Sequence, residues 1–436
     1  TMGAAQLLIK YGITANVIMP RALTDMGAAV ERVLQALDGE ERIVIHGDYD
    51  VDGATSSALL YRFLQAAGGT VRYYIPDRMT EGYGPNIAAL RKLHAEGAAL
   101  VLTVDCGIAA FDVLEQAAEE GISVAVIDHH LAESRLPRAA AIVNPNRTDC
   151  GSGLGYLAAV GVAFMLAIAV NRTLRAAGWF SQQKAPDLMG LLDIVALGTV
   201  CDVVPLQGVN RAFVRQGAQV IAEGGNRGMA ALAHSASSTP PFGTYELGFQ
   251  MGPRVNAGGR IGKADLGARL LSTDNPHEAA ALAERLDQLN TERRDIENAV
   301  RAAALEQAEE RGFDAPLVWA KGAGWHPGVV GIVASRLKEQ SNRPAIVIGV
   351  EDGIGKGSGR SVSGIDLGAP IQRLAAEGLL IKGGGHKMAA GMTVAEDKID
   401  AAEAARRLGA TVNRKLGEHG ASSAVVVPGG SQAGVV

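Results

Sequence analysis

Cysteine, aromatic residues and uninterrupted apolar stretches are all scarce in this chain. Its 436 residues include three cysteines, and only 4% of the side chains are aromatic. The cysteines Cys106, Cys150 and Cys201 have no CxxC spacing, which argues against a disulfide framework and favours the reducing cytoplasm. No run of 18 apolar residues is free of charge, so we expect no membrane span. The first residues also lack the order of a secretion signal.

A basic excess is missing as well. The formal net charge is −5, and residues 1–150 hold 19 Asp and Glu against 12 Lys and Arg. Composition alone therefore does not indicate a nucleic-acid-binding protein. What the chain has in abundance is apolar character, at 47% of its residues, which is enough for more than one core. At this length we expect two domains or more.

Short, almost wholly apolar runs alternate with helical patterns through the first 145 residues, which predicts a parallel sheet covered on both faces. A polar motif follows each run. "RIVI" (42–45) precedes "HGDYDVDG", "ALVLTV" (99–104) precedes Asp105, and "ISVAVI" (122–127) precedes Asp128-His129-His130. Because the carboxyl ends of parallel strands share one edge of a sheet, these motifs are expected to converge there.

The chemistry of these motifs indicates a divalent cation. His46, Asp50 and Asp52 can face one point from a strand-to-helix turn, and crowded carboxylates repel each other unless a positive charge lies between them. Hard cations such as Mn²⁺ and Mg²⁺ prefer carboxylate oxygens, and imidazole shifts the preference toward Mn²⁺. For one such turn alone, a solvated acidic loop or a helix N-cap is an equally good interpretation. Asp105 and the pair His129 and His130 favour the metal site.

The remainder of the chain predicts a helical region and then a second α/β domain. Residues 276–311 lack Gly and Pro after their start and repeat apolar residues every three or four positions. That pattern predicts one connector helix on the order of 50 Å long. "APLVWA" and "RPAIVIGV" then read as strands, and "GKGSGRSVSG" as a concave Gly-rich loop. The small-residue end of the chain, residues 411–436, is expected to be flexible.

In order and spacing, "HGDYDVDG", "VDCG", "DHH" and "ALGTVCDVVPL" resemble the successive motifs of the DHH phosphoesterase superfamily. "GPRVNAGGRIG", "GWHPGVVGIVASRL", "GKGSGRSVSG" and "GGGHKMAAG" resemble those of its RecJ branch, the single-strand-specific 5′→3′ exonucleases. The resemblance implies an α/β fold in which a parallel-sheet DHH domain (1–275, with a short N-terminal lead-in) is joined by a connector helix (276–312) to a smaller α/β DHHA1 domain (313–410). No five-strand pattern follows residue 410, so we expect no counterpart there of the OB-fold that full-length members commonly add.

The resemblance also implies a dinuclear Mn²⁺ or Mg²⁺ centre, with two ions activating water for phosphodiester hydrolysis. Asp105 is implied as the ligand that bridges the two ions. The assignment of Asp202 as a ligand depends on the resemblance alone. His130 is implied to contact phosphate or donate a proton. Asp48, like His130, is implied as a catalytic residue, and its role would be to orient an imidazole or a metal-bound water. The implied ligands are His46, Asp50, Asp52, Asp105, His129 and Asp202.

Substrate is expected to be held by donors that contact phosphate and do not read the base sequence. Guanidinium groups suit this because they bind phosphate with two hydrogen bonds. The family pattern places Arg78, Ser358 and Arg360 around the phosphate of the 5′ end, which would set the polarity. For each arginine, a surface salt bridge is the competing interpretation. The full expected set is Arg78, Arg254, Asn256, Arg260, Ser358, Arg360 and His386.

These expectations describe a cytoplasmic, monomeric nuclease of DNA recombination and repair, with single-stranded DNA as its main partner. A single-strand-binding protein and a helicase are suggested as protein partners. Two alternatives stay open. One is a DHH phosphodiesterase of short oligonucleotides, cyclic dinucleotides or pAp, with the same metal site. The other is a DNA-binding scaffold without catalysis, which is disfavoured because every implied ligand position is filled.

Overall fold

The computed structural model describes residues 22–78, 80–313 and 315–399. The start of the expected N-terminal lead-in (residues 1–21) and the expected flexible tail (411–436) lie outside these residues. Two compact units divide between Asn290 and Thr291, and each is described by itself.

The first unit is built on a five-stranded sheet in which every neighbouring pair is parallel, in the order β2-β1-β3-β4-β5. Helices on both faces connect the strands, as the apolar runs predict, and the expected α/β fold is confirmed. In chain order the elements are α2 (Met26–Asp38), β1 (Arg42–Gly47), α3 (Val51–Ala66), β2 (Val71–Tyr74), α4 (Ile87–Ala95), β3 (Ala98–Val104), α5 (Phe111–Glu119), β4 (Val124–Ile127) and β5 (Ala141–Val143).

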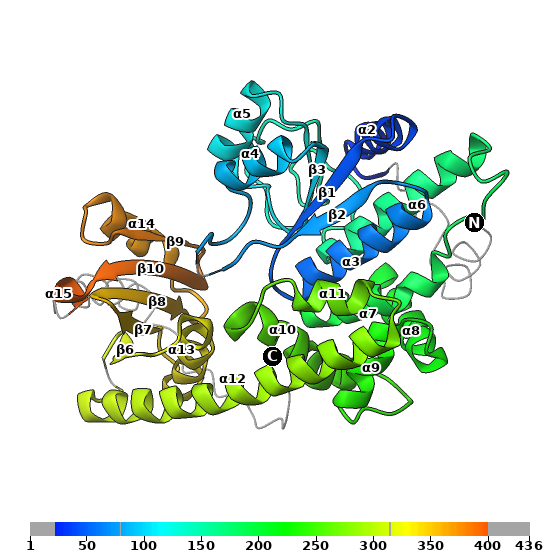
Figure 1. Cartoon of the computed structure of the whole chain (residues 1–436). Helices are drawn as coiled ribbons and strands as arrows, with labels where there is room; N and C mark the ends of the chain where they lie inside the picture. The colour runs from blue at the N-terminus through cyan, green and yellow to red at the C-terminus, as the bar shows by residue number, and fades with distance from the viewer. Residues whose placement is uncertain (1–21, 79, 314, 400–436) are drawn as a thin grey trace. The chain divides into compact units, whose positions relative to one another are not determined.

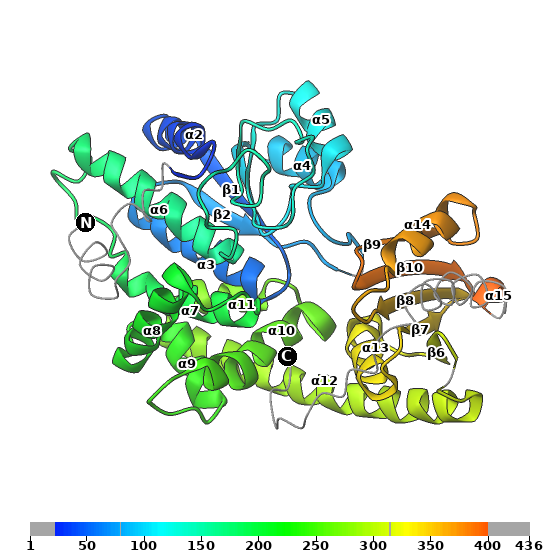
Figure 2. The same cartoon turned by 180° about the vertical axis from the view of Figure 1, so that it is seen from behind.

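The strands alternate their side chains between two cores, one on each face of the sheet. Ile43 and Ile45 of β1 belong to the larger core, which α2, α3 and α6 (Ala159–Ala176) also form. Val44 points to the smaller core under α4 and α5. Figures 1 and 2 show the two groups of helices on opposite sides of the sheet. Strands covered on both faces explain why the runs are almost wholly apolar.

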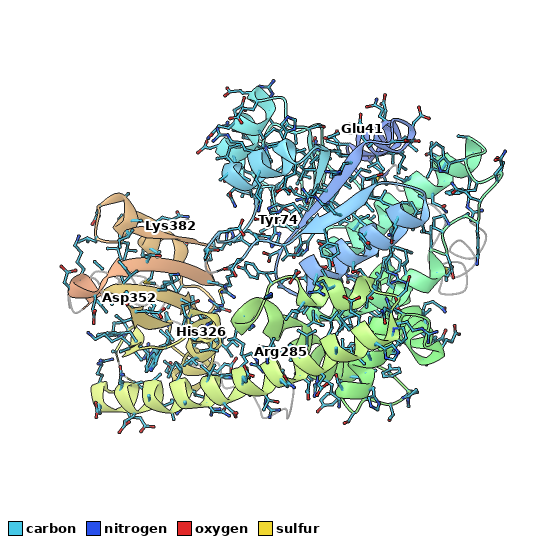
Figure 3. The ribbon with its side chains drawn as sticks, viewed as in Figure 1. Glu41, Tyr74, Arg285, His326, Asp352 and Lys382 are labelled. Carbon is cyan, nitrogen blue, oxygen red and sulfur yellow. The ribbon has the colours of Figure 1, made fainter. Side chains whose placement is uncertain are left out.

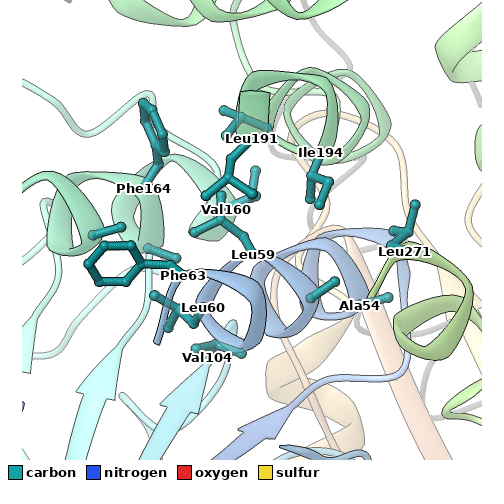
Figure 4. Packing of buried hydrophobic residues seen from close by; sticks show 14 of the residues in the cluster. Ala54, Leu59, Leu60, Phe63, Val104, Val160, Phe164, Leu191, Ile194 and Leu271 are labelled. Atoms are coloured by element: carbon teal, nitrogen blue, oxygen red, sulfur yellow. The ribbon is translucent and has the colours of Figure 1, made fainter. Parts of the chain in front are cut away.

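A helical layer follows the sheet in sequence and packs on α3. It consists of η3 (Met189–Leu191), α7 (Leu192–Cys201), α8 (Gly208–Glu223), α9 (Arg227–Ser235), the π-helix η4 (Glu246–Met251), α10 (Gly252–Ile261), α11 (Leu266–Ser272) and the start of α12 (Pro276–Arg311). Phe63 of α3 packs in the core that α6 and α7 share, near Val160 and Phe164 (Figure 4). Within the first unit, α7 packs on α3 and α6, which cover the sheet.

One helix of the first unit is long and apolar enough to cross a membrane by length and composition, although it carries charged residues. This is α6, and 72% of that stretch is buried inside the protein. Burial of this extent is what the core helix of a globular domain shows.

The second unit contains the rest of α12 and a mixed five-stranded sheet in the order β6-β7-β8-β10-β9. Residues of α12 and α13 form the core on one face of this sheet, and α14 packs on the other face. The long helix predicted over 276–311 has those bounds. The other elements are β6 (Val318–Ala323), α13 (Pro327–Ser341), β7 (Ala345–Glu351), β8 (Ile354–Arg360), α14 (Gly368–Ala376), β9 (Lys382–Gly385), β10 (Ala389–Ala395) and α15 (Glu396–Ile399).

The prediction of a Gly-rich loop around Ser358 is wrong, because Ile354–Arg360 forms strand β8. Glycine is disfavoured in strands, but β8 is paired antiparallel to β7 on one side and to β10 on the other. Its glycines leave room for neighbouring side chains. A Cβ on Gly359 would lie 2.5 Å from Leu367 Cδ2.

We predict that Phe63→Ala lowers the free energy of unfolding of the first unit by about 3–5 kcal/mol, because the ring is buried and its removal leaves a cavity. Chemical denaturation followed by circular dichroism measures the change. Leu131→Ala is the matched control, since Leu131 is 86% exposed. Equal stability of the two variants would contradict this account of the core.

Candidate metal centre

The turn from β1 to α3 places three aspartates at the carboxyl edge of the sheet. Asp50 is the N-cap of α3, and its Oδ1 accepts a hydrogen bond from the backbone N of Gly53 at 3.0 Å. This cap fixes the start of α3 at Val51. The turn is so tight that a Cβ on Gly53 would lie 2.4 Å from Asp48 O. The N-cap interpretation is therefore correct for Asp50, which lies in the acidic cluster as well.

Asp105 lies directly after β3, in a left-handed backbone conformation with φ 60°. Aspartate tolerates this region better than most residues, and such conformations concentrate at functional sites. Its side chain is buried. Its backbone oxygen accepts a hydrogen bond from the hydroxyl of Tyr83 at 3.1 Å, and the Tyr83 ring lies 6.1 Å from that of His130. Tyr83 thus borders the centre.

The residues after β4 are fixed by Asp128, whose carboxylate accepts hydrogen bonds from the backbone N of Ile108, His129 and His130. It also pairs with Nδ1 of His130 at 2.8 Å. Asn144 and Asn146 donate to the backbone oxygens of His130 and His129. The sequence alone gives neither asparagine a role. The structure assigns them to holding the histidine pair in place.

Hydrogen bonding fixes the tautomer of His129. Its Nδ1 lies 3.1 Å from Leu157 O, and a carbonyl oxygen can only accept, so Nδ1 carries the proton. The lone pair is then on Nε2, which lies 3.4 Å from Asp105 Oδ1 and 3.6 Å from Asp202 Oδ2. It is 3.9 Å from Asp52 Oδ2. An imidazole oriented in this way is the usual arrangement of a metal-binding histidine.

The remaining carboxylate comes from the helical layer, where Asp202 is the C-cap of α7. Asp52 connects α3 to α6, because its carboxylate accepts hydrogen bonds from the backbone N of Ala159 at 2.6 Å and Val160 at 2.8 Å, at the start of α6. Gly198 of α7 lies close by, and a Cβ there would be 3.2 Å from Asp52 Oδ1. These contacts hold the end of α7 near the acidic turn.

Within the described residues, side chains from β1–α3, β3, β4 and α7 form three overlapping groups whose ligand atoms lie within 4.8 Å of one another. All the members were expected from the sequence as ligands or catalytic groups. His46 belongs to none of these groups. Its Nδ1 is 3.9 Å from Cys106 Sγ. The groups are Asp105, His129 and His130; Asp52, His129 and Asp202; and Asp48, Asp50 and Asp105.

Several buried polar atoms of this centre have no hydrogen-bond partner. An unsatisfied buried acceptor is costly, and native proteins rarely leave one without a reason. An oxygen- and nitrogen-binding divalent cation would satisfy them, and the set of carboxylates and imidazoles fits Mn²⁺ or Mg²⁺. The atoms are His46 Nε2, Asp48 Oδ1, His129 Nε2 and Asp202 Oδ2.

The electrostatics point to missing positive charge. Burial, and then repulsion from Asp50, raise the pKa of Asp52 to about 7. Burial, then Asp52 and Asp50, raise the pKa of Asp202 to about 9. The pKa values of Asp48 and Asp105 are raised for the same two kinds of reason. Burial lowers the pKa of His46 to about 4, which leaves a neutral imidazole able to bind a metal.

His130 differs from the other members because its side chain is 45% exposed. Burial acts to lower its pKa, but the hydrogen bond to Asp128 and the charge of Asp128 raise the pKa overall. Burial acts to raise the pKa of Asp128, but the hydrogen bond and charge of His130 hold that pKa below its usual range. His130 is therefore the imidazole of the centre that combines exposure with a raised pKa.

The expected substrate-binding residues of the first unit lie in two places. The Arg78 guanidinium carbon is 5.1 Å above the ring of Tyr49, and the charges of Arg78 and Arg260 both act on Tyr49. Arg254 is engaged within the unit, since its Nε donates to Asp287 Oδ1 at 2.8 Å and its Nη1 to Gln250 O. The salt-bridge interpretation thus holds for part of the Arg254 guanidinium. Asn256 is half-buried on α10.

The second unit carries the other three expected substrate-binding residues, Ser358, Arg360 and His386. In β8, Arg360 Nη1 donates to Ser358 Oγ at 2.8 Å and to Gly359 O at 2.9 Å. Gly331 of α13 faces them, because a Cβ there would be 3.0 Å from Arg360 Nη2. His386 is exposed just after β9. Nearby, the side chain of His326 caps the N-terminus of α13 by accepting from Gly328 N (Figure 3).

Comparison with known proteins gives consistent matches along the chain. The N-terminal domain of the DHH family matches residues 42–199, and the DHHA1 domain matches residues 314–416. Single-stranded-DNA-specific exonuclease RecJ of Dickeya dadantii is 44% identical over 392 residues, which are 87% of this chain and 68% of that protein. RecJ of Escherichia coli K12 is 43% identical over 86% of this chain and 67% of its own length.

Solved structures agree with these matches. A crystal structure of exonuclease RecJ bound to manganese has a TM-score of 0.78 and 36% identity, covering 90% of this chain and 95% of that one. RecJ from Thermus thermophilus in complex with Mn²⁺ has a TM-score of 0.77 and 34% identity, covering 91% of this chain but 55% of that one.

We predict opposite effects of Asp105→Asn with and without metal. The folded-state pKa of Asp105 is raised, so its ionised form destabilises the fold once the pH exceeds the ordinary carboxyl range. In EDTA at pH 8 the variant should unfold at a higher temperature than the wild type, by about 2–4 °C for each kcal/mol of relieved repulsion. Mn²⁺ should raise the unfolding temperature of the wild type far more than that of the variant.

Asp352→Asn is the matched control for that experiment. Asp352 also has a positive φ, of 50°, but is exposed on the turn between β7 and β8 (Figure 3). It should behave as the wild type does in both conditions. An Asp105→Asn variant that is destabilised in EDTA, or stabilised fully by Mn²⁺, would contradict the cation site.

We predict that Gly259→Ala weakens Mn²⁺ binding about tenfold, as loss of a supporting contact does at metal sites. A Cβ on Gly259 would lie 2.2 Å from Tyr49 O, between Asp48 and Asp50, and would displace the acidic turn. Isothermal titration with Mn²⁺ measures the effect. Gly225→Ala, where no atom lies within 4 Å of the added Cβ, should bind as the wild type does. Unchanged affinity of Gly259→Ala would mean that α10 does not support the centre.

Proposed function

The chain belongs to the RecJ family of single-stranded-DNA-specific exonucleases, and we propose that it is a metal-dependent nuclease that hydrolyses phosphodiester bonds of single-stranded DNA from the 5′ end. The observation that carries this function is the convergence of four segments on one cluster of buried carboxylates and imidazoles. The chain spans 68% of the length of the Dickeya relative and 51% of the length of the Bacillus subtilis one. The activity of those whole proteins is therefore a proposal for this chain.

Manganese or magnesium, two ions to a chain, is the cofactor. When bound, the ions supply Lewis-acid polarisation of the scissile phosphate and activation of the water that attacks it. Hydrolysis of this kind needs no covalent intermediate with the protein. The residues proposed to hold the ions are His46, which lies outside the three converging groups, and five members of those groups: Asp50, Asp52, Asp105, His129 and Asp202.

The protein supplies position and charge around that chemistry. Asp105, proposed as the ligand shared by both ions, is held by its position at the end of β3 and by the left-handed backbone there. Asp48 is buried beside the ligands and orients groups at the centre. His130 is proposed to contact the phosphate or to donate a proton to the leaving oxygen, because its Nδ1 is occupied by Asp128 and its side chain is partly exposed.

Polarity is proposed to come from donors that hold the phosphate of the 5′ end. In the second unit Ser358 and Arg360 are joined by a hydrogen bond, which fixes the guanidinium plane before substrate arrives. Arg78 rests on the ring of Tyr49, next to the acidic turn. Arg254, Asn256, Arg260 and His386 are proposed as further contacts along the strand. We also propose the boundaries 1–275, 276–312 and 313–410 for the DHH domain, the connector and the DHHA1 domain.

The biological setting is proposed from the family: cytoplasmic recombination and repair of DNA, by a monomer working with a single-strand-binding protein and a helicase. The second candidate function is a DHH phosphodiesterase of short oligonucleotides, cyclic dinucleotides or pAp. The metal centre alone would serve it equally well.

We predict that a 5′-phosphorylated single strand is degraded in the presence of Mn²⁺ or Mg²⁺ and not in EDTA. With a 3′ label, products should shorten progressively, whereas a 5′ label should appear at once as mononucleotide. Asp105→Ala should remove activity while the circular dichroism spectrum is kept. Faster turnover of a dinucleotide than of the long strand would favour the phosphodiesterase, and activity retained in Asp105→Ala would exclude the dinuclear centre.

A further inference from the structure

Two aromatic rings are stacked on each other and left open to solvent where the π-helix η4 begins. Tyr245 is 59% exposed and Phe249 is 46% exposed. Their ring centroids are 5.4 Å apart, with an interplanar angle of 25°. Large apolar side chains in the described part of the chain are otherwise mostly buried. Contiguous exposed apolar groups of this kind mark binding sites in many proteins.

The pair is not needed to hold η4 in place. Leu247 and Met251 are both fully buried and anchor the helix in the core of the first unit. The Cys201 thiol adds a hydrogen bond to Leu247 O at 3.5 Å, and a Cβ on Gly248 would lie 3.2 Å from Val200 Cγ1. The buried side of η4 therefore explains its fold, and the exposed rings are left without a structural role. π-Helical turns occur disproportionately at functional sites.

The position of η4 links the rings to the metal centre. It packs on Val200 and Cys201, which directly precede the proposed ligand Asp202. It continues without a break into α10, whose Gly259 lies against Tyr49 of the acidic turn. The ten residue steps from Phe249 to Gly259 span about 15 Å of helix. The rings thus lie at the start of a continuous helix that touches two of the four segments carrying proposed ligands, at a distance that a few nucleotides can span.

We propose that Tyr245 and Phe249 form a base-stacking platform for the single-stranded DNA that the metal centre cleaves. This inference rests on the proposed function and adds to it the residues that grip the bases. Aromatic faces stack on any base, so they suit an enzyme that must pass every sequence. Bases in a duplex are already stacked and paired, so the platform favours single strands.

Bases fit the observations better than a protein partner does. An apolar peptide groove needs walls of aliphatic side chains, whereas this feature is a pair of flat rings on a helix that leads to the proposed metal centre. The strand that occupies the centre must continue away from it, and η4 offers an aromatic surface on the same unit. A protein partner that uses the rings instead is one outcome of the test below.

The test compares strands with and without bases. Binding of a fluorescent oligothymidine and of the same backbone made abasic is measured by anisotropy in Ca²⁺, with gels to verify that the strands stay intact. The double variant Tyr245→Ala with Phe249→Ala should bind oligothymidine about tenfold more weakly than the wild type. It should bind the abasic strand as the wild type does, because no base is present to stack. The control Tyr245→Phe with Phe249→Tyr keeps both rings and should bind like the wild type.

Measurements of turnover test the stacking platform separately from the proposed nuclease activity. On a long strand, KM should rise about tenfold in the double alanine variant, while kcat and all parameters for a dinucleotide stay unchanged. A wild type that binds oligothymidine through the rings but cleaves nothing would refute the nuclease and keep the platform. Equal binding by wild type and double variant, or equal loss on the abasic strand, would overturn the platform. Intact DNA binding with loss of a protein partner would overturn it too.

Discussion

Repulsion among buried like charges is the constraint on which the rest of this structure depends. Asp48, Asp52 and Asp105 are almost fully buried within a few ångströms of other carboxylates, and Asp202 is their neighbour. Burial and mutual repulsion raise the pKa values of all four. A fold that keeps them together without compensation would lose stability at neutral pH. Two divalent cations held by these residues would reverse that balance, so the same crowding that destabilises the metal-free protein would give it affinity for metal.

The backbone is arranged to make that crowding possible. Parallel strands bring the ends of β1, β3 and β4 to one edge, and the left-handed Asp105 turns its carboxylate into the cluster. Glycines then allow the helical layer to approach. Gly198 lets α7 pack on α3 beside Asp52, and Gly259 lets α10 touch the acidic turn. Hydrogen bonds that His130 donates to Asp128 and His129 donates to Leu157 O orient the two histidines. Each of these backbone features and hydrogen bonds is local, but together they define one site.

Sequence predicted the parts of this arrangement that follow from periodicity. Apolar runs followed by polar motifs locate the sheet edge, because parallel strands necessarily share it, and the long helix follows from its regular apolar spacing. Asp202 could be assigned only from family resemblance, since a carboxylate at the end of a helix has no local signature of metal binding. The pairing of Arg254 with Asp287 joins residues 33 positions apart, which no local pattern reveals.

The exposed pair of Tyr245 and Phe249 was missed because exposure depends on tertiary packing. The Gly-rich segment at β8 was misread as a loop, since its strand conformation comes from pairing on both sides.

Electron paramagnetic resonance of the protein titrated with Mn²⁺ tests the central claim most directly. The account predicts that two ions bind to each chain and that the second produces the exchange-coupled spectrum of two manganese ions sharing a ligand. Two metal ions in such sites lie about 3.5–4 Å apart, close enough for that coupling. A spectrum of isolated ions at every ratio, or no bound manganese, would contradict the shared centre.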